Sequence, residues 1–432
     1  MFRISFGAAA AREYMRNPPR AAYLGIGFAM NAMLGTAYAW SVFKTPLVAG
    51  FGANSLSAML PFALALAMFS VGMVFAGRLV DRHGPRKVAV LGGLLVGAGY
   101  ALSSLMDDTP WPMATLTLTY GVIVGLGLGF AYNPPIPTAV RWFPARKGLA
   151  SGVVVMGFGL SALFTAPIAD FLIGRFGVAD TFLILGLAFG VGLVALGSLL
   201  RFPPEGWQPP VERSTVTKRT WQPLAEVPTR DMVRTPAFWS AWVLYVLGTA
   251  GGFMIIGNAK TIAEEVAFVR DAFLAIAAVQ ILAVFNSLGR PIFGRLADVQ
   301  SPKRALLVMY AVLLGAMGLL SVSTMWIPLY AGIALTGMVF GGFLAVMPAL
   351  ATLFFGTKYL GMNYGLLFTG YGFGAIVALF ASGWIRDSFG SYGPAFYIGI
   401  VLSVVGLVLS LQVRPPRPSV VRVEPERVIA HA

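Results

Sequence analysis

The chain has 432 residues, of which 57% are hydrophobic and only 11% are charged, and its mean hydropathy is +0.78. About a quarter of the residues in a soluble protein of this length would be charged, so the composition excludes an ordinary soluble domain. The sequence contains no cysteine, which excludes disulfide and thiol chemistry. Neither His83 nor His431 resembles half of a metal site, and we expect no metal and no cofactor.

The apolar residues form runs long enough to cross a bilayer of ~30 Å, which takes about 20 residues of helix. The first twenty residues carry four arginines and no early apolar core, so we expect no cleavable signal peptide. Helices satisfy their own backbone groups in lipid, whereas open strands do not. We therefore predict an all-α membrane protein with 12 transmembrane helices, at residues 21–43, 56–77, 88–106, 112–138, 148–171, 179–200, 237–259, 272–294, 305–323, 327–352, 361–384 and 391–412.

The Lys and Arg residues are distributed unevenly between the two sides of these spans. With both termini on one side, 25 of the 31 lie on that side and five on the other. This asymmetry is the positive-inside pattern. It predicts a multi-pass protein of the cell (inner) membrane with both termini in the cytoplasm. The lipid bilayer thus accounts for the net charge of +14, and we expect no nucleic-acid partner.

Two stretches of the first half of the chain return in the second half. "GRLVDRHGPRK" at 77–87 returns as "GRLADVQSPKR" at 294–304, and "GLASGVVVMGFG" at 148–159 returns as "GMNYGLLFTGYG" at 361–372. Such repeats indicate two pseudo-symmetric six-helix bundles. We predict an N-terminal bundle at 1–200, a polar, Pro-rich cytoplasmic linker at 201–235, and a C-terminal bundle with a cytoplasmic tail at 236–432.

Arg290 is the one Lys or Arg that lies deep inside an apolar run. It precedes Asp298 by eight residues, about 12 Å of helix at ~1.5 Å per residue, so we expect it near the bilayer midplane. An arginine there costs ~2.5 kcal/mol or more, and nearly all of the 17 acidic residues lie in loops, tails or helix ends. Because guanidinium can bind a carboxylate through two parallel hydrogen bonds, we predict that Arg290 binds an anionic substrate. The alternative is that Arg290 donates only to backbone carbonyls, such as those freed near Pro291.

Other polar side chains in the predicted spans are candidates to join Arg290. Asn286 lies four residues earlier, on the same helix face. Tyrosine donates one hydrogen bond and presents a flat apolar face, although a membrane tyrosine more often packs or anchors at the interface. The aromatic candidates with a polar group are Tyr38, Trp40, Tyr132 and Tyr371.

Tyr132 directly precedes the stretch "NPPIP". Pro134, Pro135 and Pro137 interrupt the helical hydrogen bonds and free backbone carbonyls. Freed backbone groups in a membrane are tolerated only where protein or water satisfies them. We therefore expect a break in the fourth span beside the candidate site.

Several of these stretches resemble a known family. "GRLVDRHGPRK" is similar to the loop between helices two and three of the major facilitator superfamily, and its degenerate return after helix eight is also characteristic. "YAWSVF" at 38–43, "RWFPARKGLASG" at 141–152 and "VRTPAFW" at 233–239 resemble the oxalate:formate antiporter family, which adjoins the monocarboxylate transporters. The resemblance spans all the predicted helices and implies a secondary transporter that works by alternating access.

The resemblance also implies roles for particular residues. Arg290 corresponds to an arginine of helix eight that binds the substrate, and aromatic cage positions correspond to Tyr38, Tyr132, Phe340 and Phe368. The family's second cation, a lysine of helix eleven, is replaced here by Tyr371. With one fixed cation, the chain looks like a carrier of a monocarboxylate such as lactate, pyruvate or formate, by proton symport or anion exchange. Asn286 stands where monocarboxylate transporters often have an acid, which puts an Asp-based proton relay in doubt.

The two "GRL.D" loops are expected to control the conformation. In the superfamily such a loop stabilises the outward-facing state. The residues to which we assign this role are Gly77, Asp81, Arg86, Gly294, Asp298 and Arg304. Charge contacts between helix ends would involve Asp81, Arg86 and Arg304.

Other functions are less consistent with the sequence. An enzyme would need a membrane-embedded acid–base pair or metal site, and an ATP-driven pump would need a P-loop; neither pattern is present. A sugar site would use amides and carboxylates that these spans largely lack. A non-transporting sensor on the same fold and a dicarboxylate antiporter of the oxalate/formate type stay open as alternatives. We expect a functional monomer whose partners are a small carboxylate and, in a symporter, protons.

Overall fold

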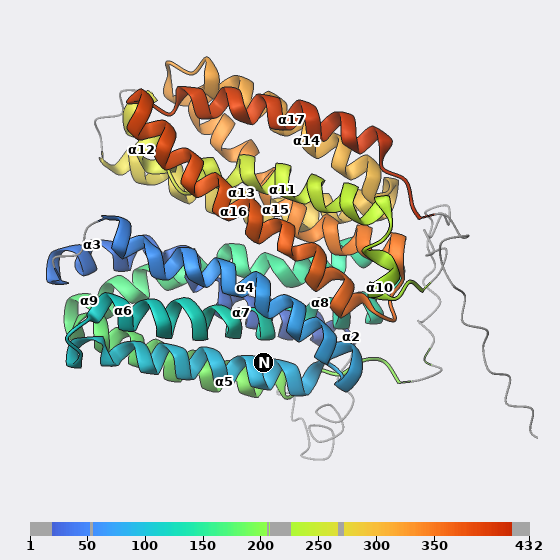
Figure 1. Cartoon of the computed structure of the whole chain (residues 1–432), viewed down its shortest axis with the longest axis horizontal. Helices are drawn as coiled ribbons and strands as arrows, with labels where there is room; N and C mark the ends of the chain where they lie inside the picture. The colour runs from blue at the N-terminus through green and yellow to red at the C-terminus, as the bar shows by residue number, and fades with distance from the viewer. Residues whose placement is uncertain (1–19, 52–54, 205–206, 208–225, 267–271, 417–432) are drawn as a thin grey trace, which may run out of the picture.

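The structure is a computed structural model that describes residues 20–51, 55–204, 207, 226–266 and 272–416. Most of the predicted cytoplasmic linker and of both predicted cytoplasmic tails lies outside the described residues. Figure 1 shows the helices arranged as two bundles, one formed by the first half of the chain and one by the second half. Nine described helices are long and apolar enough to cross a membrane. One of these nine is α9, which covers two predicted spans.

The N bundle begins with a first span in which two α-helices are joined by a short 3-10 segment. Its fourth span is divided into four pieces, one of them a π-helix. The elements are α2 (Arg20–Leu34), η1 (Gly35–Ala39), α3 (Trp40–Phe51), α4 (Ser55–His83), α5 (Pro85–Ser103), η2 (Ser104–Asp108), α6 (Pro112–Leu116), η3 (Thr117–Val124), α7 (Gly125–Tyr132), α8 (Pro135–Trp142) and α9 (Lys147–Gly197).

The C bundle is built from longer, less interrupted helices. Its elements are α10 (Thr229–Met232), α11 (Pro236–Ile256), α12 (Ala259–Val266), α13 (Ala272–Gln300), α14 (Pro302–Ser321), α15 (Trp326–Phe355), α16 (Leu360–Phe389) and α17 (Gly393–Gln412).

Proline and glycine explain the two main irregularities of the N bundle. The fourth span breaks between α7 and α8 at Asn133 and Pro134, as the "NPPIP" stretch predicts. Proline has no backbone N–H to donate to the preceding turn. The helix α9 turns at Gly177, whose φ of 82° falls in the left-handed region, which glycine adopts without a steric cost. This turn separates the predicted spans 148–171 and 179–200.

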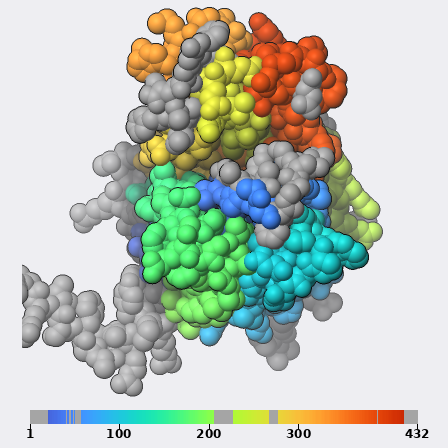
Figure 2. All heavy atoms as spheres, turned by 90° about the vertical axis from the view of Figure 1, so that its left-hand side faces the viewer, coloured from blue at the N-terminus to red at the C-terminus, as the bar shows by residue number. Residues whose placement is uncertain are grey.

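Two helix pairs bring the bundles into contact at the end of the molecule that carries α8 and α10, which we call the linker end (Figure 1). A Cβ atom on Gly77 of α4 would lie 2.1 Å from the carbonyl oxygen of Gly361 in α16. A Cβ atom on Gly294 of α13 would lie 2.2 Å from the carbonyl oxygen of Gly148 in α9. The repeated glycines thus permit backbone-to-backbone contact between the bundles. Figure 2 faces the opposite end, where α3 lies at the seam between the bundles.

Replacement of Gly77 or Gly294 by leucine should force the bundles apart at the linker end, because neither position has room for a side chain. The sequence contains no cysteine, so spin labels on cysteines introduced at the exposed Arg82 and at Lys358 report the separation without background labelling. We expect a longer distance in both variants. The control is Gly315→Leu, where a Cβ meets nothing within 4 Å. An unchanged distance in Gly77→Leu and Gly294→Leu would show that these contacts do not hold the bundles together.

Candidate functional site

Arg290 lies in the middle of α13 and is completely buried, with 0% of its surface exposed. Its Nε and Nη2 groups donate to Oδ1 of Asn286, at 3.4 and 3.2 Å. Its Nη1 group donates to the backbone carbonyl of Val155, which belongs to α9 of the other bundle. Both partners are neutral, so the positive charge is hydrogen-bonded without being neutralised by them. Part of the alternative prediction is therefore correct: Arg290 does donate to a backbone carbonyl, but across the bundle interface and not near Pro291.

The surface of α9 that faces Arg290 is made of small residues and one ring. A Cβ atom on Gly159 would lie 3.2 Å from Cζ of Arg290, and one on Gly152 would lie 2.5 Å from its carbonyl oxygen. The ring of Phe158 lies 5.9 Å from Cζ, within the ~6 Å range of cation–π attraction. The glycines of "GLASGVVVMGFG" thus leave space for both the backbone and the guanidinium of Arg290.

The predicted aromatic residues gather around Tyr371 in the same region. The hydroxyl groups of Tyr38 and Tyr371 are hydrogen-bonded at 2.8 Å, which joins η1 of the N bundle to α16 of the C bundle. The ring of Phe368 stacks on that of Tyr371 at 4.6 Å, and Phe340 of α15 lies 6.1 Å from it. Tyr132 completes the group, 5.7 Å from Phe368. The structure therefore brings Tyr38, Tyr132, Phe340, Phe368 and Tyr371 together.

Trp40 is the one predicted site residue that the structure places elsewhere. Its Nε1 group donates to the carbonyl of Ala58 at 3.0 Å. Its ring packs at 4.6 Å against Tyr120, within the N bundle. Tyr38 belongs to the 3-10 segment whereas α3 begins at Trp40, and this change of helix type directs the two side chains to different neighbours. Trp40 is therefore a packing residue of the N bundle.

Two further tyrosines lie beside the predicted group. Tyr245 of α11 and Tyr364 of α16 are completely buried, and their rings lie 6.0 and 5.8 Å from that of Phe368. Tyr245 had no distinguishing signal, because it is one aromatic residue in a long apolar run. Tyr364 lies inside the repeated stretch "GMNYGLLFTGYG", in which only the glycines match the first half of the chain and indicated a role.

Two carboxylates close the linker end in a symmetric way. Asp81 accepts hydrogen bonds from the backbone N–H groups of Gly361 and Met362, at 3.0 and 2.8 Å, at the beginning of α16. Asp298 accepts from Gly148 and Leu149, at 2.7 and 2.8 Å, at the beginning of α9. The first N–H groups of a helix lack partners inside it and carry partial positive charge. The two "GRL.D" stretches, predicted as loops, lie in the last turns of α4 and α13, and each caps a helix of the opposite bundle.

The basic partners at this end differ from the predicted ones. Arg86 and Arg304 lie in the first turns of α5 and α14, and both are exposed. The cation beside Asp81 is Arg141, whose Nη2 lies 3.8 Å from Oδ1. The same Nη2 donates to the carbonyls of Thr357 and Lys358 at 2.9 and 3.2 Å.

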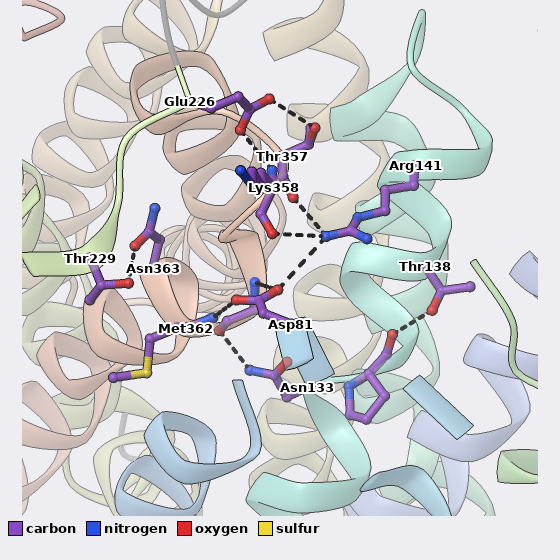
Figure 3. A network of polar contacts seen from close by, with 12 residues as sticks. Asp81, Asn133, Thr138, Arg141, Glu226, Thr229, Thr357, Lys358, Met362 and Asn363 are labelled. Carbon is purple, nitrogen blue, oxygen red and sulfur yellow. Dashed lines mark hydrogen bonds and ion pairs between the residues drawn. The ribbon is translucent and has the colours of Figure 1, made fainter. Parts of the chain in front are cut away.

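Glu226, in the last third of the predicted linker, contacts the same two residues, Thr357 and Lys358 (Figure 3). Glu226 accepts hydrogen bonds from the backbone N–H of Lys358 at 2.7 Å and from the hydroxyl of Thr357 at 3.3 Å. Asn133, at the break of the fourth span, donates to the carbonyls of Met73 and Gly361, at 3.2 Å each. The linker end is therefore closed by a continuous polar network that includes both bundles and the linker.

Comparison with known proteins shows the family. Residues 24–323 and 259–430 match the family model of the Major Facilitator Superfamily. The chain belongs to this superfamily. It is 30% identical over 344 residues to the superfamily transporter YhjX of Escherichia coli K12, a match that covers 79% of this chain and 82% of the relative. The predicted superfamily and all-α membrane fold are confirmed. As a member of the Major Facilitator Superfamily, the protein is a membrane transporter. The alternative that it is an enzyme is therefore excluded.

Two more distant relatives of this superfamily carry substrate names. The chain is 26% identical over 419 residues to the oxalate:formate antiporter of Oxalobacter formigenes, covering 95% of this chain and 96% of that one. It is 25% identical over 357 residues to monocarboxylate transporter 12 of Xenopus laevis, covering 78% and 76%. The fold is also that of the crystal structure of the transporter FucP in the outward conformation, with a TM-score of 0.69 at 13% identity, over 90% of this chain and 98% of that one.

The capping carboxylates should control the rate of conformational exchange and not the affinity for substrate. Asp81→Asn removes a charge from a helix N-terminus, which is worth about 0.3–2 kcal/mol, and should slow transport while the substrate Kd changes less than about twofold. The measurement compares transport by reconstituted protein with binding to purified protein. The control is Asp180→Asn, an exposed acid of the same bundle. A large loss of affinity with an unaltered distance across the linker end would contradict this role.

Proposed function

We propose that this transporter carries small organic anions, most specifically a monocarboxylate of the lactate, pyruvate or formate type, and that Arg290 binds the carboxylate. The observation that supports the proposal is the completely buried guanidinium whose hydrogen-bond partners, Asn286 and Val155, are both neutral. The names of the oxalate:formate antiporter and of the monocarboxylate transporters among the relatives point to the same class of substrate.

Charge compensation is the physical reason for a carboxylate. A buried arginine is costly unless a counter-charge is present, and a guanidinium offers five N–H donors in a planar fork. Asn286 and Val155 receive three hydrogen bonds from Arg290, which leaves two N–H groups beyond these. A carboxylate at this place supplies the missing negative charge and accepts two parallel hydrogen bonds.

The same contacts connect binding to alternating access. Arg290 belongs to the C bundle, and the carbonyl that it reaches belongs to the N bundle. The Tyr38–Tyr371 hydrogen bond also crosses the interface. A substrate that competes for these donors changes the contacts that hold the bundles together at their centre. We place the linker end in the cytoplasm, with both termini, and the closed network there corresponds to a state that is shut on the cytoplasmic side.

The sequence also supports proposals about domain bounds, oligomeric state, location and coupling. The bundle boundaries lie near residues 200 and 236, and the working unit is a monomer in the cell membrane. Transport is coupled either to protons or to a second anion. Asn286 in place of an acid favours exchange, which counterflow in the absence of a pH gradient would detect.

The second candidate is a dicarboxylate antiporter of the oxalate/formate type, because that relative aligns over nearly the whole chain. A dianion beside one guanidinium would leave about one negative charge poorly compensated, which costs several kcal/mol in a low dielectric. Tyr371 and Tyr38 contribute only neutral hydroxyl groups. The one-cation site therefore favours a monoanion.

Arg290→Ala should abolish carboxylate binding and uptake while the protein still inserts in the membrane, because the one charged donor among the described side chains of the site is lost. Arg290→Lys should also fail largely, since a point charge does not reproduce the planar fork. Thermal stabilisation by pyruvate and uptake of labelled pyruvate into vesicles provide the measurements. Leu288→Ala, an exposed residue of the same helix, controls for folding. Undiminished transport by Arg290→Ala would disprove the assignment.

Tyr371→Lys should shift the preference from monocarboxylates toward oxalate, because it adds a second cation beside Arg290. Tyr371→Phe, which removes only the hydroxyl, should not. Competition of lactate and oxalate for one labelled substrate measures the preference in wild type and both variants. The charge argument fails if the wild-type protein binds oxalate more tightly than every monocarboxylate tested.

A further inference from the structure

Three tyrosine hydroxyl groups at the centre of the molecule have no hydrogen-bond partner among the residues that the structure describes. They belong to Tyr132, Tyr245 and Tyr364, each of which is completely buried. Other buried tyrosines are satisfied: Tyr310 donates to the carbonyl of Leu244, and Tyr371 is paired with Tyr38. A buried hydroxyl without a partner is destabilising. Phenylalanine would supply the same ring without that cost.

The three tyrosines come from three helices of both bundles and pack around one ring, that of Phe368. Tyr132 lies on α7, Tyr245 on α11 and Tyr364 on α16, and all three rings lie within 6.0 Å of the ring of Phe368. None of the three hydroxyl groups makes a hydrogen bond to a residue that the structure describes. Each phenol therefore has an O–H group that can donate to a ligand.

The cluster lies next to Arg290 but nearer the linker end. Tyr364 precedes Tyr371 by seven residues, about 10 Å along α16. The ring of Phe158 links the two, because it lies 5.5 Å from the ring of Tyr132 and 5.9 Å from Cζ of Arg290. A ligand whose carboxylate is held by Arg290 can therefore extend past Phe158 toward the three hydroxyl groups.

We propose that Tyr132, Tyr245 and Tyr364 form a second polar subsite, which binds a neutral oxygen at the end of the substrate away from its carboxylate. The proposal rests on the carboxylate site proposed above. The ligand class is a short carboxylic acid with a keto or hydroxyl oxygen. A phenol donates a hydrogen bond but carries no positive charge, so the subsite fits a neutral acceptor better than a second carboxylate. An unsubstituted acid such as propionate leaves the three phenols unpaired.

The test compares the dissociation constants of pyruvate and propionate, which differ in one keto oxygen. Wild-type protein should bind pyruvate about tenfold or more tightly than propionate, the effect of one lost hydrogen bond to a buried group. Tyr364→Phe and Tyr245→Phe should each weaken pyruvate binding toward the propionate value and leave propionate within about twofold. Tyr120→Phe removes a hydroxyl from another buried tyrosine, one that packs on Trp40, and should change neither constant.

Two results would overturn the subsite. One is equal binding of pyruvate and propionate by the wild-type protein, and the other is an equal loss of both ligands in the tyrosine variants. Arg290→Ala separates this proposal from the preceding one, because it should abolish binding of both acids. If Arg290→Ala binds both acids normally, the carboxylate site itself is wrong. If it binds neither while the tyrosine variants leave the ratio unchanged, only the second subsite is wrong.

Discussion

The rest of the site depends on one positive charge buried where two helix bundles meet. Arg290 is fully buried, and its partners are an amide oxygen of its own helix and a backbone carbonyl of the opposite bundle. Neither partner cancels the charge, and an uncompensated charge at the centre of a membrane is costly. The glycines of α9 let the backbones approach there and leave the guanidinium room. An anion that enters this place meets a fixed, planar set of donors.

At the linker end, the two bundles are held together by a small number of polar contacts. Asp81 and Asp298 each cap the first turn of a helix in the other bundle. These contacts are short and charged, and they involve only a few backbone groups. Arg141, Glu226 and Asn133 add contacts around the loop at 356–358. The contacts that close this end are therefore few and confined to the ends of the helices.

Much of the fold follows from patterns that the sequence shows directly. Apolar runs gave the spans, and the two repeats pointed to two bundles whose matching glycines meet at the interface. Arg290 was recognisable because a charge in an apolar run is rare. Asn286 was recognisable because four residues make one helical turn, and the two side chains are indeed hydrogen-bonded. The "NPPIP" stretch predicted the break in the fourth span because proline cannot continue the hydrogen-bond ladder.

The structure differs from the sequence-based expectations where the result depends on contacts between distant helices. Trp40 is only two residues from Tyr38, but the helix changes type between them and Trp40 faces the N bundle. Arg141 and not Arg86 meets Asp81, because the end of the fourth span approaches the loop at 357–358. Tyr245 and Tyr364 carry no local signal: their importance lies in unpaired hydroxyl groups that only the packing of three helices creates.

The most direct test of the central claim is the binding of pyruvate and its neutral amide, pyruvamide, to wild-type and Arg290→Ala protein by calorimetry. The two ligands have nearly the same shape and differ in the charge that Arg290 is proposed to bind. We predict that the wild-type protein prefers pyruvate by about 100-fold or more, as expected for a buried charged hydrogen-bonded pair. The preference should fall to within about threefold in Arg290→Ala. Equal binding of the two ligands by the wild-type protein, or a preference that survives in Arg290→Ala, would contradict the account.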